Sequence, residues 1–272
     1  MLVNGQLQNH LPVLDRAVQY GDGAFETILI RNAKPIFFEA HLARLSDACQ
    51  RLKIPLATPL LLAEFNSFVQ SSAPDGIVKI IISRGAGGRG YGVATNMEHT
   101  RILQFHPLPE NYERYSQEGI SVFKCAHPLS RNSALAGLKH LNRLDQVMAS
   151  MELPDTVQEG LMCDDTGLLI EGVKSNVFLF KDGRWYTPTL DQAGVAGVMR
   201  AQIIQTIQRE GAKHLAIAAI EFADIATAEE VIVCNSVFGI WPVTALQWDD
   251  SMIGFAIGEN TRHLQRKVWN IA

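Results

Sequence analysis

The sequence contains few cysteines, and none of them are spaced like the ligands of a metal site. Cys49, Cys125, Cys163 and Cys234 lie far apart, which favours buried thiols in a reducing compartment over a disulfide framework. No apolar run approaches the length of a membrane-spanning helix. The first residues, M-L-V-N-G-Q, lack the basic and apolar segments of a secretory signal. We therefore expect a cytoplasmic protein with no metal and no membrane segment.

An excess of basic residues is also lacking, because the formal net charge is −4. This balance argues against a nucleic-acid or anionic-membrane partner. Internal repeats and low-complexity segments are absent as well. What remains is ordinary for a globular protein: 47% of the residues are apolar and 19% are charged. A chain of 272 residues is long enough for one large domain or two medium ones.

Apolar periodicity predicts helices and strands on both sides of a proline-rich segment. Pro107 and Pro109 interrupt regular structure, so we predict a linker at 107–116 between an N-terminal domain (1–106) and a C-terminal domain (117–272). The predicted fold is α/β (α+β). In the first half we expect a hairpin over 25–38, a helix over 42–52, and strands at 77–82 and 101–105. In the second half we expect a helix from about 139 to 152, strands at 168–170, 177–180 and 231–234, a turn at 181–184, and a helix over 198–210.

A glycine-rich run at 85–90 matches the dinucleotide-binding pattern G-x-G-x-x-G and follows a predicted strand. That pattern requires a helix to begin at the third glycine, and the next residues, Y-G-V-A-T-N, do not predict one. We therefore reject a dinucleotide site. Arg84 and Arg89 suggest instead a loop that meets an anionic ligand, with a plain surface loop as the alternative.

Lys139 is the most informative single residue. It lies in L-A-G-L-K-H-L-N-R, between a small-residue turn and an amphipathic run. Desolvation by such neighbours lowers the pKa of an amine, which can then form an imine with a carbonyl or act as a base. A solvated surface lysine is the more common outcome for such a residue taken alone.

Other residues along the chain could hold a phosphorylated aromatic aldehyde. Gly194–Arg200 leads into a helix whose first amides could bind phosphate, and Ser236 follows a buried strand. Arg44, one turn from His41, could clamp the same phosphate. Glu171 ends an apolar strand, where a carboxylate requires a cationic partner such as a protonated pyridine nitrogen. Each feature alone is more often structural, and the combination carries the hypothesis.

These segments together resemble the fold-type IV pyridoxal-phosphate enzymes over essentially the whole chain. That family includes branched-chain aminotransferases, D-amino acid aminotransferases and 4-amino-4-deoxychorismate lyases. The resemblance implies a small N-terminal α/β domain and a larger C-terminal mixed α/β pseudo-barrel. The shared segments are H-x-x-R-L (41–45), the Lys139 segment, E-G-x-x-S-N (171–176), G-V-M-R (197–200) and the Asn–Ser turn at 235–236. Y-G-D-G-A-F-E-T (20–27), S-R-G-A-G-G-R-G-Y (83–91) and G-L-K-H-L-N-R-L (137–144) are most similar to the lyases, and the last two are the more specific.

The resemblance implies a role for each matching residue. Lys139 would bind the aldehyde of pyridoxal 5′-phosphate covalently and shuttle protons, while Glu171 would face its pyridine nitrogen. Two positions depart from the aminotransferases: Met199 replaces a common threonine, and Asn235 replaces a glycine. The implied cofactor-binding residues are Arg44, Lys139, Glu171, Asn176, Val198, Met199 and Ser236. The expected substrate-binding residues are Thr27, Arg84, Arg89 and Tyr91.

The implied reaction is the loss of pyruvate from 4-amino-4-deoxychorismate, giving 4-aminobenzoate for folate biosynthesis. Aromatisation of the ring drives such an elimination, so no amino acceptor is needed. An aminotransferase of the same fold, acting on D-amino or branched-chain acids, is the closest alternative. A non-enzymatic protein that binds a small anion is the alternative from another class. The family resemblance further implies a homodimer.

Overall fold

The computed structural model describes residues 1–94 and 97–269. The chain separates into two compact units. The first unit comprises Met1–Pro109 together with Leu138–Asn142, and the second comprises Glu110–Gly137 together with the chain from Arg143 onward. Each unit has its own sheet and is described by itself.

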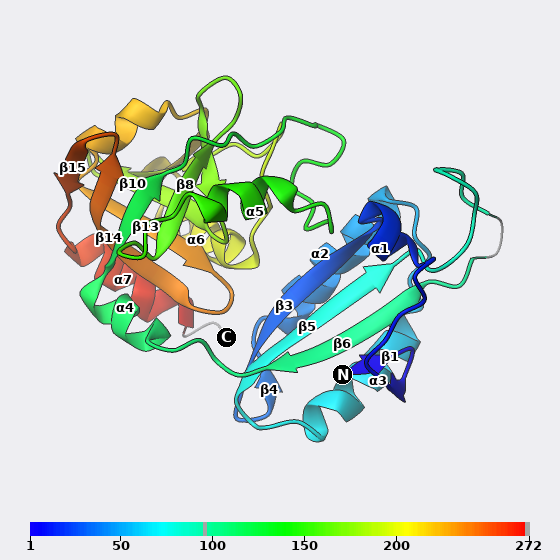
Figure 1. Ribbon diagram of the computed structural model, residues 1–272. Helices are drawn as coiled ribbons and strands as arrows, with labels where there is room; N and C mark the ends of the chain where they lie inside the picture. The colour runs from blue at the N-terminus through cyan, green and yellow to red at the C-terminus, as the bar shows by residue number, and fades with distance from the viewer. Residues whose placement is uncertain (95–96, 270–272) are drawn as a thin grey trace. The chain divides into compact units, whose positions relative to one another are not determined.

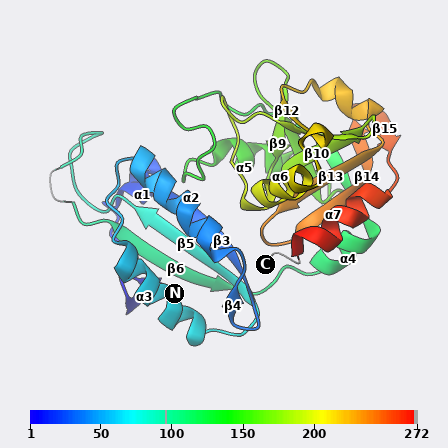
Figure 2. The same ribbon diagram turned by 180° about the vertical axis from the view of Figure 1, so that it is seen from behind.

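In the described residues the first unit is built on a six-stranded antiparallel sheet in the order β2-β1-β6-β5-β3-β4. Two helices, α2 and α3, cover the same face of this sheet (Figures 1 and 2). The strands are β1 (Leu2–Val3), β2 (Gln6–Leu7), β3 (Gly23–Arg31), β4 (Lys34–Pro35), β5 (Gly76–Ser83) and β6 (Thr100–His106), and the helices are α1 (Arg16–Tyr20), α2 (Phe38–Arg51) and α3 (Thr58–Gln70).

The turn of the predicted hairpin over 25–38 is confirmed by the pairing of β3 with β4, but the second strand covers only Lys34–Pro35 and α2 begins at Phe38. The turn residues Asn32 and Ala33 have φ values of 49° and 60°, the left-handed conformation that a two-residue hairpin turn requires. The predicted strands at 77–82 and 101–105 are β5 and β6. Ile28 and Val78 are fully buried, and Leu45 of α2 is 1% exposed, so packing between sheet and helix forms the core of this unit.

The second unit contains, among the described residues, a nine-stranded mixed sheet in the order β12-β11-β10-β13-β14-β7-β8-β9, with β15 paired to β14. The sheet curls into a half-barrel, so that β9 approaches β10 and β11. Along residues 1–94 and 97–269, no helix is both long and apolar enough to cross a membrane. The strands are β7 (Ile120–Lys124), β8 (Glu159–Cys163), β9 (Leu169–Gly172), β10 (Asn176–Lys181), β11 (Arg184–Pro188), β12 (Leu215–Ala218), β13 (Glu230–Asn235), β14 (Gly239–Trp248) and β15 (Ser251–Gly254). The helices are α4 (Tyr112–Glu118), α5 (Leu144–Met151), α6 (Val198–Glu210) and α7 (Glu259–Trp269), with short 3₁₀ helices at Ala212–His214 and Phe222–Thr227.

The predicted helix over 198–210 is confirmed as α6, which lies between Gly197 and Gly211. The predicted turn at 181–184 joins β10 to β11, with positive φ at Asp182 and Gly183. An apolar core in this unit includes Val177 of β10 and side chains from β7, β13 and β14.

The region around Lys139 differs from the expected helix over 139–152. The helix α5 begins only at Leu144 and ends at Met151. Lys139 itself lies in an extended segment that belongs to the first unit, although the expected C-terminal domain (117–272) included it. The first stretch of the first unit ends at Pro109, within the predicted linker. The helix α4 begins inside that linker, at Tyr112.

Candidate active site

Backbone hydrogen bonds hold Lys139 at the edge of β3 in the first unit. The amide of Phe25 donates to the carbonyl of Lys139 at 2.9 Å, and the amide of Leu141 donates to the carbonyl of Gly23 at 2.9 Å. A side chain at Gly23 would not fit, because its Cβ would lie 2.2 Å from the carbonyl oxygen of Ile82. Because Gly23 has no side chain, the segment 138–142 can lie against β3 like a short additional strand.

The amine of Lys139 lies over the ring of Phe25, with Nζ 4.3 Å from the ring centroid. Thr27 lies two residues further along β3 and so faces the same side of the sheet. The ring attracts the charged form of the amine, which offsets part of the desolvation expected for this lysine. One face of β3 thus presents an amine, an aromatic ring and a hydroxyl.

The opposite face of β3 carries a buried charge cluster formed by Glu26, His41 and Arg44. Arg44 donates from Nε to Glu26 Oε1 at 2.7 Å and from Nη2 to Oε2 at 2.6 Å. His41 Nδ1 lies 2.6 Å from Glu26 Oε2. The Glu26 side chain is 1% exposed and that of His41 is fully buried, whereas that of Arg44 is 14% exposed. The bidentate contact fixes the guanidinium of Arg44, the predicted phosphate ligand.

The charges in this cluster compensate one another. Burial raises the pKa of Glu26, but Arg44 and His41 outweigh it and lower that pKa to about 2. Burial lowers the pKa of His41 below its ordinary value, although Glu26 opposes the shift. At neutral pH the cluster therefore holds an ionised Glu26, a charged Arg44 and a neutral His41. Among the described residues, the buried Nε2 of His41 has no hydrogen-bond partner.

In the second unit, Glu171 lies in β9 with its carboxylate buried and hydrogen-bonded on both oxygens. The amide of Val195 donates to Oε2 at 2.7 Å, and Gln146 Nε2 donates to Oε1 at 3.5 Å. Asn176 donates from Nδ2 to Oε2 at 3.5 Å and to the Val195 carbonyl at 2.9 Å. Asn176 therefore links the carboxylate to the loop that precedes α6. The structure brings Glu171 and Asn176 together, as a shared binding role requires.

The first turn of α6 has the form of an anion-binding site. Its N-cap is Gly197, and no side chain in the described part of the chain caps the helix. The side chains of Val198 and Met199 are buried, so these residues can offer a ligand their backbone amides. A Cβ at Gly197 would lie 2.0 Å from Asn176 Oδ1, so only glycine allows this approach.

In the turn after β13, the side chain of Asn235, which precedes Ser236, makes three hydrogen bonds. Asn235 Oδ1 accepts hydrogen bonds from the amides of Val237 and Phe238, both at 2.9 Å, while Nδ2 donates to the carbonyl of Lys174 at 3.0 Å. The side chain thus closes the turn and connects it to the loop before β10. A glycine could not make these bonds, which gives the departure at Asn235 a structural reason.

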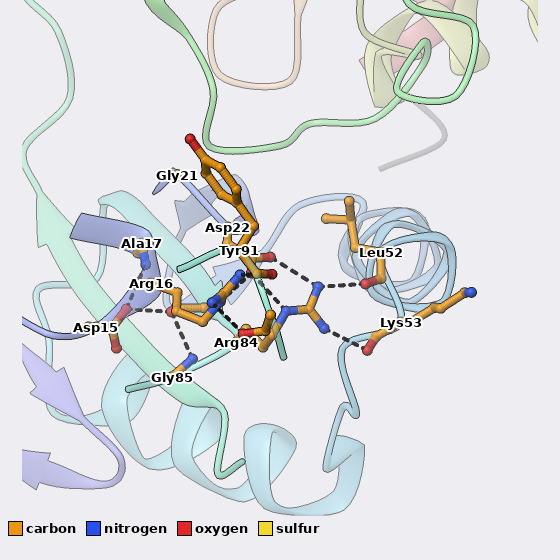
Figure 3. Close-up of polar contacts among 12 residues, drawn as sticks. Asp15, Arg16, Ala17, Gly21, Asp22, Leu52, Lys53, Arg84, Gly85 and Tyr91 are labelled. Atoms are coloured by element: carbon orange, nitrogen blue, oxygen red, sulfur yellow. Dashed lines mark hydrogen bonds and ion pairs between the residues drawn. The ribbon is translucent and has the colours of Figure 1, made fainter. Parts of the chain in front are cut away.

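Arg84 has extensive contacts within the protein (Figure 3). It donates from Nε and Nη2 to the carboxylate of Asp22 at 2.8 and 3.0 Å, and to the carbonyls of Leu52 and Lys53 at 2.7 and 2.8 Å. These bonds use most of the five N–H groups of a guanidinium, which indicates a structural role. Substrate binding by Arg84 stays a prediction.

The glycine-rich loop carries the other two predicted substrate residues on the surface. Arg89 is exposed, and the side chain of Tyr91 is 86% exposed. Residues 90–94 form a turn and a loop and not a helix. This agrees with our rejection of the dinucleotide pattern. Thr95 and Asn96, also part of that argument, lie outside the described residues.

Sequence reasoning missed the roles of Glu26 and Arg16. Glu26 lies within the apolar run of β3, where an unpaired carboxylate would be unfavourable. The same argument that singled out Glu171 could have found it. Arg16 lies before the Y-G-D-G-A-F-E-T segment and had no comparable signal, because, apart from Asp22, its hydrogen-bond partners are backbone carbonyls more than 70 residues away.

Comparison with known proteins identifies the family. A model of "Amino-transferase class IV" matches residues 23–246. The chain belongs to this family. It is 33% identical over 264 residues to an aminodeoxychorismate lyase of Vibrio harveyi, covering 97% of each chain. It is similar to the crystal structure of 4-amino-4-deoxychorismate lyase from Pseudomonas aeruginosa, with a TM-score of 0.93 and 44% identity over 99% of this chain and 98% of that one.

The fold extends to more distant members of the class IV aminotransferases. The branched-chain amino acid aminotransferase of Escherichia coli superposes with a TM-score of 0.85 at 20% identity, over 99% of this chain and 93% of that chain. At this identity the likeness shows the fold alone. It confirms the predicted two-part α/β architecture of the fold-type IV enzymes.

Class IV enzymes use pyridoxal 5′-phosphate, and each unit, taken by itself, holds groups of the kind that bind this cofactor. The first unit offers the amine of Lys139 and the ordered guanidinium of Arg44. The second unit offers a buried carboxylate at Glu171 and a helix start without a side-chain cap at Gly197. An aldehyde, a phosphate and a basic ring nitrogen are the groups that such donors bind.

Replacing Glu26 with glutamine should change how unfolding depends on pH. Its folded pKa of about 2 lies below the ordinary value of 4.5, so the carboxylate stabilises the fold fully above pH 4.5. This contribution is lost as the pH falls through about 2. Because each pKa unit corresponds to about 1.4 kcal/mol, we expect Glu26→Gln to cost about 3 kcal/mol at pH 7 and progressively less below pH 4.5.

Urea unfolding between pH 7 and pH 3 measures this difference. Glu39→Gln, on the exposed side of α2, is the matched control and should leave the free energy of unfolding nearly unchanged. A constant difference between wild type and Glu26→Gln across this pH range would contradict the buried ion pair.

Proposed function

We propose that the chain is a 4-amino-4-deoxychorismate lyase, which releases pyruvate from 4-amino-4-deoxychorismate and forms 4-aminobenzoate for folate biosynthesis. The similarity to the Pseudomonas aeruginosa lyase along 99% of the chain carries the proposal. The lyase of Vibrio harveyi supports it over a similar length. An aminotransferase is the alternative, because the same fold serves both reactions.

Lys139 is the proposed catalytic residue. Pyridoxal 5′-phosphate, when bound, supplies the electron-withdrawing ring that makes the proton on the substrate carbon acidic. The amine of Lys139 removes this proton and later returns a proton to the departing group. A well-placed acid–base residue of this kind contributes about 10²–10⁴-fold to a rate. Phe25 limits the positions of the amine by holding Nζ near its ring.

The remaining proposed cofactor residues orient and charge the ring. Glu171 keeps a proton on the pyridine nitrogen, while Asn176 holds that carboxylate and the loop before α6. Arg44 balances part of the phosphate charge. Backbone amides of Val198 and Met199, together with the Ser236 hydroxyl, complete the proposed phosphate site.

Substrate recognition is proposed for residues of the first unit. Thr27 lies on the face of β3 that carries Lys139. Arg89 and Tyr91 lie on the exposed glycine-rich loop and would meet the two carboxylates of the substrate. Arg84 holds the base of this loop through Asp22, so we propose an indirect role for it.

A direct assay tests the proposed reaction. Wild-type enzyme with bound cofactor should release 4-aminobenzoate and pyruvate from 4-amino-4-deoxychorismate. Lys139→Ala should lose about 10³-fold or more in kcat, because the proton-transferring amine is gone. Borohydride reduction followed by peptide mapping should label Lys139 in the wild type only.

Incubation with D-alanine and 2-oxoglutarate separates the two candidate functions. We expect slow or undetectable formation of glutamate compared with the release of 4-aminobenzoate. Faster transamination than elimination would favour an aminotransferase. A colourless protein that borohydride does not label would favour a non-enzymatic anion-binding protein.

Gly197→Ala tests the phosphate site. The added Cβ would lie 2.0 Å from Asn176 Oδ1, so the loop before α6 must move. We expect the dissociation constant of pyridoxal 5′-phosphate to rise about tenfold or more, a loss of about 1.4 kcal/mol. Fluorescence titration of the apo protein measures it.

Gly183→Ala is the control for this substitution. Gly183 has a positive φ, which Gly197 does not, and no described atom lies within 4 Å of its added Cβ. This variant should show only the backbone strain of about 1 kcal/mol in stability, with unchanged cofactor affinity. Equal affinities in both variants and the wild type would remove the α6 start from the cofactor site.

We propose that the protein is a homodimer in which α5 contributes to the interface. Leu144, Val147, Met148 and Met151 are spaced three and four residues apart and form one exposed stripe. Leu144 and Met151 are each 75% exposed. A stripe of this kind is unfavourable in water, and a two-fold axis would bury it against its own copy.

The double variant Met148→Glu/Met151→Glu should therefore become monomeric. Burying two carboxylates in an apolar contact is strongly unfavourable, so we expect the molar mass to fall by about half. Size-exclusion chromatography with light scattering measures the mass. Ser150→Glu on the same helix lies off the stripe and should stay dimeric, and a monomeric wild type would contradict the proposal.

A reducing compartment such as the cytoplasm is proposed for the protein. All four cysteines, Cys49, Cys125, Cys163 and Cys234, are buried free thiols. Burial raises the pKa of the Cys49 and Cys234 thiols to about 12, which makes them unreactive. Free thiols of this kind agree with a reducing environment and with a structural role.

A further inference from the structure

Two consecutive residues, Asp15 and Arg16, hold the loop at 85–94, the first at its base and the second at its tip. At the base, Ser83 Oγ donates to Asp15 Oδ1 at 2.5 Å, and Thr100 Oγ1 donates to Asp15 Oδ2 at 2.7 Å. Ser83 ends β5 and Thr100 begins β6, so Asp15 connects the two strands from which the loop extends. Asp15 is fully buried, which excludes water from this junction.

Arg16 holds the tip of the same loop. Its Nη1 donates to the carbonyls of Gly90 and Gly92, both at 3.2 Å, and its Nη2 donates to the carbonyl of Tyr91 at 3.3 Å. One guanidinium thus binds three successive carbonyls. The side chain of Arg16 is only 6% exposed, so these bonds are shielded from competing water.

The carboxylate of Asp22 also binds the guanidinium of Arg16 (Figure 3). Arg16 Nε and Arg84 Nε both donate to Asp22 Oδ2 at 2.8 Å. Burial raises the pKa of Asp22, but Arg84 and Arg16 together lower it below the ordinary value. Because Arg84 also binds the carbonyls after α2, at Leu52 and Lys53, the loop tip is connected to the end of that helix.

The loop backbone allows this contact only with glycine at position 88. Gly88 has a φ of +82°, and an added Cβ would lie 2.3 Å from the carbonyl oxygen of Gly92. The same Cβ would lie 3.3 Å from Arg16 Nη1. The glycine therefore lets the loop close on itself around the guanidinium.

While the backbone is held, the side chains at the tip face outward. Tyr91 is 86% exposed, and its ring lies 5.4 Å from that of Tyr20, over which Arg16 packs at 4.9 Å. Arg89 is exposed as well. A flexible loop would have to be ordered on binding, at a cost of about 1–2 kcal/mol for each residue fixed.

We propose that Arg16 is a positioning residue that orders the 85–94 loop in advance, so that Arg89 and Tyr91 meet a substrate with two carboxylates at low entropic cost. This proposal rests on the proposed lyase function for the identity of the substrate. Arg16 acts through the loop backbone and does not touch the substrate. Without it, binding of the substrate weakens while the chemical step at Lys139 is retained.

Two variants of Arg16 test the proposal. Arg16→Met keeps the aliphatic stem and removes every donor, while Asp22 retains Arg84 as its partner. Arg16→Lys keeps the charge beside Asp22, but one ammonium cannot span three carbonyls. Arg51→Met, which removes an exposed arginine 3.9 Å from Asp47, is the matched control.

Limited trypsin digestion reads out the loop without reference to activity. Cleavage after Arg89 requires a mobile backbone, so we expect about tenfold faster cleavage in both Arg16 variants than in wild type or Arg51→Met. Mass spectrometry locates the cut, and Arg89→Gln in the Arg16→Met background should abolish it. Equal cleavage rates in wild type and both Arg16 variants would overturn the proposal.

Kinetics test the link to substrate. We expect KM for 4-amino-4-deoxychorismate to rise about tenfold in both Arg16 variants, with kcat changed by about twofold at most and with unchanged affinity for pyridoxal 5′-phosphate. Faster cleavage with an unchanged KM would also overturn the positioning role. A wild-type enzyme that releases no 4-aminobenzoate would refute the proposed function instead, and the digestion would still decide whether Arg16 orders the loop.

Discussion

The placement of Lys139 depends on the pairing of its backbone with the edge of β3. The bonds to Phe25 and Gly23 make a five-residue segment part of a sheet whose other strands come from the first 106 residues. Main-chain hydrogen bonds define the direction of the segment, so the side chain of Lys139 is aimed before any ligand arrives. The ring of Phe25 then narrows the positions open to the amine. Preorganisation of this kind is what a proton-transferring group requires.

The two faces of β3 carry different groups around the charged side chains. Phe25 faces the amine of Lys139, whereas Glu26 lies on the other face and receives both hydrogen bonds of the Arg44 fork. An arginine without this carboxylate would be free to adopt many rotamers. A carboxylate without Arg44 and His41 would be protonated when buried this deeply. The pair is therefore best understood as a unit that orients one cation toward an anionic group.

Sequence patterns predicted most local structure well, since local signals determine it. Gly197 and Gly211 delimit α6. Asp182–Gly183 marks the hairpin turn between β10 and β11, because glycine and aspartate adopt the backbone angles needed there. The pairing of Lys139 with β3 could not be predicted, because it joins residues more than 100 positions apart and involves only backbone groups. The contacts of Arg84 with the carbonyls after α2 left no sequence signature, because any residue type offers a backbone carbonyl.

The return of the chain to its first unit at residues 138–142 has a consequence for biosynthesis. The ribosome completes residues 1–109 well before it adds Lys139, and the edge of β3 lacks its partner during that interval. An unpaired sheet edge invites pairing with other chains. The ribosome must therefore translate a further stretch of the second unit before this edge is covered, which makes protection of the early unit depend on the arrival of the segment that carries Lys139.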